Sequence, residues 1–127
     1  MPIRNGFARP QTGIVGVSEI TPVLDVEQLR EVSLADEDLM RELLAALIAD
    51  TEKQLPLLHL AIRNTDGQQC ARLAHYCKGA CANVGAQAAA TVLAALERNA
   101  KDGAMEECSQ QLAALGRELD RLRLKEI

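Results

Sequence analysis

The chain has 127 residues, of which 48% are hydrophobic and only 2% aromatic, and its formal net charge at pH 7 is −4. A single domain of this length can bury its own core, and a core of Leu, Ala, Ile and Val suits closely packed helices. The acidic charge and the absence of Lys/Arg runs count against a protein that binds nucleic acid.

The first 22 residues differ in composition from the rest of the chain. They contain three prolines and three glycines without sustained hydrophobic periodicity, so we predict an N-terminal tail or linker over 1–22 and a helical domain over 23–127. The start lacks the apolar region of a secretory signal, and the longest apolar run, residues 43–49, is too short to cross a bilayer. We therefore expect a cytoplasmic protein without membrane insertion.

Two helices are expected in the first half of the domain. A short one should run from Asp25 to about residue 32, because Asp25 and Gln28 have the spacing of a capping box. Ser33 and Asp36 repeat that signal ahead of a long apolar stripe that reaches residue 62. Pro56 lies inside the stripe, where it should kink one long helix or separate two shorter ones.

Three further helices are expected in the second half. Thr65 and Gln68 form another capping box, opening a helix that Gly85 would end. An Ala-rich helix over 86–100 and a last helix from about residue 104 follow. Short connections between four sizeable amphipathic helices predict an all-α fold, an antiparallel four-helix bundle with a short extra N-terminal helix.

The four cysteines indicate which face of one helix is buried. Cys70, Cys77 and Cys81 fall on one side of the helix expected over 65–85, and Cys108 lies on the last helix. The sequence contains no Cys-x-x-Cys pair. We interpret all four as reduced core thiols.

A histidine stands on the opposite side of that helix. At about 100° per residue, His75 points away from the cysteine face. Its expected companions on the outward face are Ala71, Lys78, Gly79 and Ala82, so the imidazole is bordered by very small side chains and one cation. This arrangement suits a side chain that must meet the active site of another protein.

The residue types at this face are suited to accepting a phosphoryl group. Neutral imidazole is available as a nucleophile near neutral pH. Lys78, one turn along the same face, can reach the negative charge that a phosphoryl group would add. Gly79 leaves room for a partner, and because Gly in mid-helix costs roughly 1 kcal/mol relative to Ala, its presence hints at a functional reason.

The stretch around His75 resembles a known family signature. Residues 74–85 read Ala-His-Tyr-Cys-Lys-Gly-Ala-Cys-Ala-Asn-Val-Gly, and they resemble the histidine phosphotransfer (HPt) domain, in which Ala-His-x-Leu-Lys-Gly precedes small residues. Cys77 stands where Leu is usual. The resemblance implies a phosphorelay carrier without kinase activity, which exchanges a phosphoryl group on imidazole Nε2 with receiver domains of response regulators and hybrid sensor kinases.

The resemblance also suggests supporting residues and partners. Family members often hold the other imidazole nitrogen with Gln or Glu on the next helix, and Glu97 lies at the matching distance along the chain. An ordinary charged residue without a role at the site is a nearly equal interpretation of Glu97. Arg72, with Ala71 and Ala82, is expected to contribute to receiver docking. We expect a monomer with no cofactor of its own, and Mg²⁺ bound in the partner receiver.

The same residues leave one main alternative function and argue against two others. An inert helical interaction or scaffold domain is the main alternative, and it predicts no phosphorylation. A metal site formed by His75, Cys77 and Cys81 is disfavoured because the helix points the imidazole away from both thiols. Catalysis by the chain on its own is disfavoured by the lack of a Gly-rich nucleotide loop or a nucleophile elbow. His59 has no chemically suggestive neighbours in the sequence.

Overall fold

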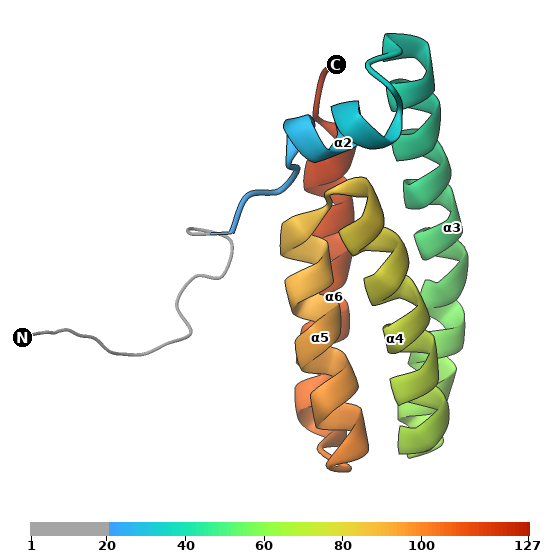
Figure 1. Cartoon of the computed structure of the whole chain (residues 1–127). Helices are drawn as coiled ribbons and strands as arrows, with labels where there is room; N and C mark the ends of the chain where they lie inside the picture. The colour runs from blue at the N-terminus through green and yellow to red at the C-terminus, as the bar shows by residue number, and fades with distance from the viewer. Residues whose placement is uncertain (1–20) are drawn as a thin grey trace, which may run out of the picture.

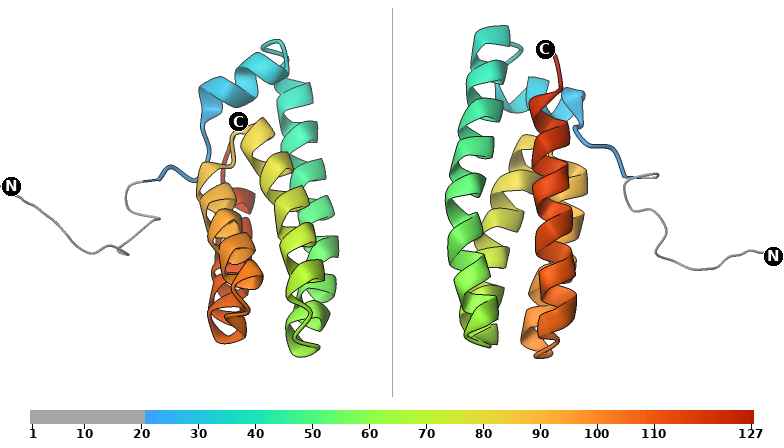
Figure 2. Two further views of the ribbon diagram at one scale, coloured as in Figure 1. Left: turned by 60° about the horizontal axis from the view of Figure 1, so that its bottom comes forward. Right: turned by 180° about the vertical axis from the view of Figure 1, so that it is seen from behind.

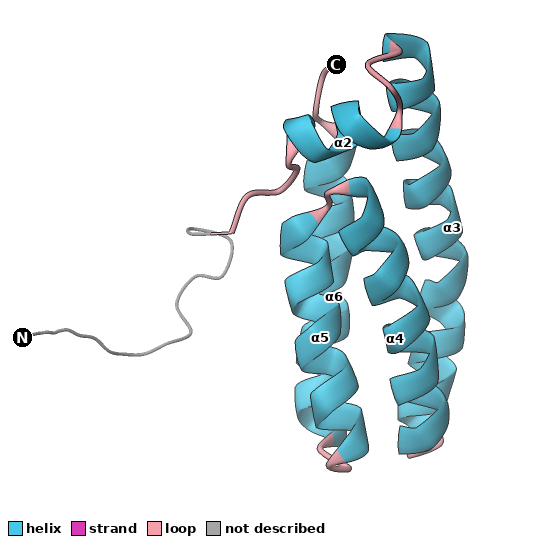
Figure 3. Cartoon of the chain, viewed as in Figure 1, coloured by secondary structure: helices cyan, strands magenta, loops and turns pink. Residues whose placement is uncertain are grey.

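A computed structural model of the chain describes residues 21–127, so nearly all of the predicted tail, 1–22, lies outside the described residues. Within the described part the chain forms helices and no strands (Figure 1; Figure 3). The helices are α2 (Val26–Val32), α3 (Glu37–Arg63), α4 (Gly67–Val84), α5 (Gln87–Lys101) and α6 (Met105–Arg123). The predicted all-α class, with one short helix ahead of four long ones, is confirmed.

The four long helices stand side by side and alternate in direction along the chain (Figure 1; Figure 2). Helix α4 packs between α3 and α5, and α6 closes the bundle by packing on α5 and α3. Helix α2 lies across one end of the bundle, near the C-terminus (Figure 1). None of the helices of residues 21–127 combines the length and the hydropathy needed to span a membrane.

Aliphatic side chains fill the space between the four long helices, and thiols complete it. The cysteines are free and buried, as predicted. The largest fully buried apolar side chains come from α2, α3, α5 and α6, and they are Leu29, Met40, Leu58, Leu93, Leu96, Leu115, Leu119 and Leu122. Because α4 contributes cysteines and alanines to this core, its neighbours can approach closely.

Helix α2 is tied to the end of α4. Asp25 caps α2 as predicted, its carboxylate accepting a hydrogen bond from the Gln28 backbone N–H at 3.1 Å. The reciprocal half of the capping box is absent, because the Gln28 amide donates to the Ala82 carbonyl at 2.5 Å. The Asp25 N–H donates instead to the Gly85 carbonyl at 2.8 Å. Gly85 ends α4 in the left-handed conformation, φ 98°, as predicted.

Two predicted helix caps were wrong, Ser33 by three residues and Thr65 by one. Helix α3 is capped by Asp36, whose carboxylate accepts from the Leu39 N–H at 3.1 Å, whereas Ser33 donates its hydroxyl to the Leu29 carbonyl at the end of α2. Helix α4 is capped by Asp66, because Thr65 has a φ of 55° and belongs to the turn. In both cases an aspartate next to the helix supplied the better acceptor.

Helix α3 continues unbroken past Pro56, so the alternative of two shorter helices is wrong. The proline side chain is exposed, and its ring therefore displaces no core residue. Packing of the buried side chains on both sides of it, such as Thr51 and Leu58, maintains the helix despite the missing backbone donor.

Candidate functional site

Helix α4 presents His75 to solvent, as the helical projection predicts. The three cysteines of α4 face the core and are at most 1% exposed. The His75 side chain is 68% exposed. The difference follows from the 3.6-residue repeat, since residue 75 lies far around the helix from residues 70, 77 and 81.

The surroundings of His75 agree with the prediction at three positions and disagree at one. Gly79 and Ala82 are exposed and Lys78 is half-buried, and a Cβ added at Gly79 would meet no atom within 4 Å. Ala71 was expected on the outward face, but it is only 7% exposed. The predicted exposure of Ala71 was wrong because α5 packs against that side of α4, so the buried surface of α4 extends beyond its three cysteines.

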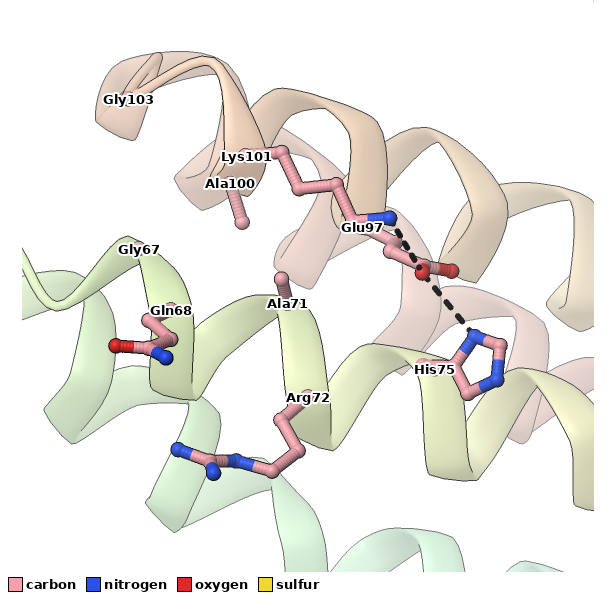
Figure 4. Close-up of a pocket in the computed structure, with 9 residues that line it drawn as sticks. All are labelled: Gly67, Gln68, Ala71, Arg72, His75, Glu97, Ala100, Lys101 and Gly103. Carbon is pink, nitrogen blue, oxygen red and sulfur yellow. Dashed lines mark hydrogen bonds and ion pairs between the residues drawn. The ribbon is translucent and has the colours of Figure 1, made fainter.

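Glu97 of α5 contacts the imidazole ring from below the surface. The residue is 8% exposed. Its Oε2 lies 3.1 Å from His75 Nδ1, which is the contact that the resemblance suggested. The same carboxylate binds two ammonium groups, Lys78 Nζ at 2.8 Å from Oε1 and Lys101 Nζ at 3.2 Å from Oε2. Figure 4 shows the contacts of Glu97 with His75 and Lys101.

These contacts determine the charge of Glu97 and, through it, the form of the imidazole. The hydrogen bond from Lys78 contributes most, with those from Lys101 and His75, to lowering the pKa of Glu97 to about 2, against the opposing effect of burial. An ionised carboxylate can only accept hydrogen bonds, so the ring must donate through Nδ1–H. In the neutral ring, Nε2 then carries the free lone pair and can act as the nucleophile.

A groove extends from His75 along the boundary between α4 and α5. Its volume is about 810 Å³. The methyl groups of Ala71 and Ala100 face one another across it, and Arg72 lies at its α4 edge (Figure 4). Arg72 is exposed and donates to the Gln69 side chain at 2.9 Å. The groove is open because four of its lining residues are small. Besides the two alanines these are Gly67 and Gly103, which lie at the end away from His75.

The thiols of α4 are not arranged for metal binding. His75 faces solvent while Cys77 and Cys81 face the core. Burial raises the pKa of Cys77 to about 12 and that of Cys81 to about 11, so both remain thiols at neutral pH. Within residues 21–127 no group of three or more His, Cys, Asp or Glu side chains is placed to hold a metal ion.

The sequence prediction missed Lys101, which reaches the same carboxylate oxygen as His75. A signal for it was available, because residues 97 and 101 are four apart and opposite charges at this spacing meet on a helix. The sequence does not show that this ion pair lies beside His75, because α5 is brought against α4 only by tertiary packing.

Comparisons with known proteins identify the family that the chain resembles over most of its length. The family model for the Hpt domain matches residues 42–125. A search of curated proteins gives no significant match. Among solved structures, the chain is similar to histidine-containing phosphotransfer protein B (HptB) from Pseudomonas aeruginosa PAO1, with 30% sequence identity and a TM-score of 0.74. The alignment covers 81% of this chain and 90% of that protein.

Proposed function

Because the chain belongs to the Hpt domain family, we propose that His75 is the residue through which it carries a phosphoryl group. The role of the chain is histidine phosphotransfer in a two-component phosphorelay. The observation that supports His75 as the acceptor is its exposed ring, held through Nδ1 by an ionised carboxylate. His59, the other histidine, is exposed on α3 and has no such partner among the described hydrogen bonds and ion pairs.

The proposed transfer needs no proton movement at the ring. The Nε2 lone pair attacks the phosphorus of a receiver aspartyl phosphate in line with the leaving oxygen. The new N–P bond forms as the P–O bond breaks, and the aspartate leaves as a carboxylate with the bonding electron pair. The ring keeps its Nδ1–H and becomes positively charged, so the anionic Glu97 beside it stabilises the product.

The bundle and its partner divide the remaining tasks. The chain supplies orientation and the lysines near Glu97, and the receiver domain supplies Mg²⁺ and most of the stabilisation of the transferring group. We propose that the chain has no kinase activity of its own and passes the phosphoryl group on to a second receiver. We also propose a monomer in the cytoplasm, a location that the four free buried thiols favour.

The test is transfer of labelled phosphate from phosphorylated receivers to the purified chain. We expect acid-labile label on the wild-type chain, none on His75→Gln and full label on the matched control His59→Gln. No label on the wild-type chain with any receiver would favour an inert scaffold domain. Equal label on His75→Gln would place the acceptor elsewhere.

A further inference from the structure

The groove that begins at His75, the α4–α5 groove, has an apolar floor and basic edges. The methyl groups of Ala71 and Ala100 form its floor (Figure 4). Arg72 lies at the α4 edge and Lys101 at the α5 edge (Figure 4). Of the described residues that line the groove, Glu97 alone is acidic. The surface therefore combines apolar contact area with positive charge on both sides.

These positive charges are only partly compensated by the chain itself. Glu97 is already bound by His75 and by two lysines. Among residues 21–127, Arg72 has no carboxylate within ion-pair distance, and its guanidinium donates to the neutral side chain of Gln69. The Lys101 side chain is 65% exposed. In a chain with a net charge of −4, the groove thus offers two accessible cations beside its apolar floor.

A second groove of similar size lacks this combination. It lies between α3 and α6 and has a volume of about 700 Å³. Two of its three basic side chains, Arg41 and Arg123, pair with carboxylates of the chain. Two acidic side chains, Glu52 and Glu126, line it as well. Its charges are compensated from within, whereas Arg72 in the α4–α5 groove is left for a partner.

The α4–α5 groove lies on the side of His75 that faces away from the acceptor nitrogen. Glu97 and Lys101, which line it, meet at Oε2, the oxygen that also contacts Nδ1. Figure 4 shows that the other ring nitrogen, Nε2, points away from Ala71 and Ala100. A receiver active site that approaches Nε2 therefore does not need to enter the groove.

We propose that the α4–α5 groove binds a short acidic segment of a partner protein, which places an apolar side chain against Ala71 and Ala100 and carboxylates against Arg72 and Lys101. The groove runs from residue 75 to residue 67 of α4, about 12 Å at 1.5 Å per residue. This length accommodates about two turns of a helix or about four extended residues. The apolar side chain supplies contact area, and the carboxylates determine the direction of the segment.

Binding in the groove does not depend on the function proposed above, but its consequence for phosphotransfer rests on that function. A partner that carries both the acidic segment and a receiver domain is held beside His75. Transfer at Nε2 then becomes effectively intramolecular, which raises the effective concentration of that receiver. The segment therefore favours its own partner over other proteins with the same receiver chemistry.

The test is an NMR titration of the full chain with the peptide Glu-Glu-Asp-Leu-Leu-Glu-Glu-Asp. We expect saturable amide shifts confined to the residues that line the groove. A peptide with lysine at every acidic position, and one with serine at both leucines, should give no such shifts. Arg72→Glu should weaken binding by about three- to tenfold, because the reversal removes one attraction and adds a repulsion of similar size, and added salt should weaken binding too.

Arg98 provides the matched control for Arg72. It is exposed on α5 and does not line the groove. Arg98→Glu changes the net charge of the chain as much as Arg72→Glu does, so it separates a local contact from a general electrostatic effect. We expect Arg98→Glu to bind the acidic peptide as the wild-type chain does.

Every other result overturns the proposal. Shifts that are absent, that spread over basic residues elsewhere, or that weaken equally in Arg72→Glu and Arg98→Glu would show that the groove does not select acidic segments. Groove shifts that grow with protein concentration alone would assign the groove to a second copy of the chain, and groove shifts caused by Val15→Asp would assign it to the chain's own first 20 residues. The proposed function stands or falls separately, on whether the wild-type chain takes label from a receiver.

Discussion

Replacing Gly79 in α4 should affect stability and phosphotransfer in opposite ways. Gly inside a helix costs about 0.5–1 kcal/mol relative to Ala. An added Cβ at Gly79 would meet no atom within 4 Å, so no clash offsets the gain. Gly79→Ala should therefore raise the free energy of unfolding by about 0.5–1 kcal/mol. In a domain of this size the melting temperature should rise by about 2–5 °C.

A larger side chain at the same position should obstruct the receiver. Gly79 is exposed and lies one turn from His75 on α4, so the Gln side chain of Gly79→Gln would occupy space that an incoming active site needs. Misplacement of reacting groups by about 1 Å can cost about 100-fold in rate. We expect transfer to Gly79→Gln to be slowed by at least about tenfold, with the fold intact by circular dichroism.

Gly116 in α6 is the matched control, because a Cβ added there would also meet no atom within 4 Å. Gly116→Ala should stabilise the protein as Gly79→Ala does, and Gly116→Gln should transfer at the wild-type rate. The assays are thermal denaturation and single-turnover transfer from one phosphorylated receiver. Equal transfer rates for the two Gln variants would refute the argument from access, and an unchanged melting temperature in Gly79→Ala would refute the argument from free space.

Three further predictions concern charge and packing. Because the pKa of Glu97 falls from 4.5 to about 2 on folding, its ion pairs stabilise the protein above about pH 4.5 and are lost as the pH falls toward 2. The difference in unfolding free energy between wild type and Glu97→Gln, measured in urea, should shrink over that range; a constant difference would contradict this. Gly67→Ala places a Cβ against the Ala100 carbonyl oxygen and should cost about 1–3 kcal/mol, so an unchanged melting temperature would be the contrary result. Pro56→Ala restores a backbone donor inside α3 and should raise the free energy of unfolding by up to about 3 kcal/mol. The urea midpoint should then rise with an unchanged m-value, whereas a lower midpoint would show that the proline is needed.

The sequence by itself determined the helices and the orientation of His75. Both depend on local rules, because a helix with its cysteines on one face must turn residue 75 to the other. The end of α4 was equally local, since Gly85 adopts a left-handed conformation that few other residues tolerate. Local rules failed at the beginnings of α3 and α4, where neighbouring polar residues compete as caps and small differences in backbone geometry decide between them.

Only the tertiary structure decided what surrounds the imidazole. The packing of α5 against α4 buries Ala71 and opens the groove beside it. The same packing brings Lys101 to the carboxylate that holds His75. Helical periodicity tells which way a side chain points from its own helix, but it cannot tell which neighbour covers it. That depends on how two helices meet, which is a property of the whole bundle.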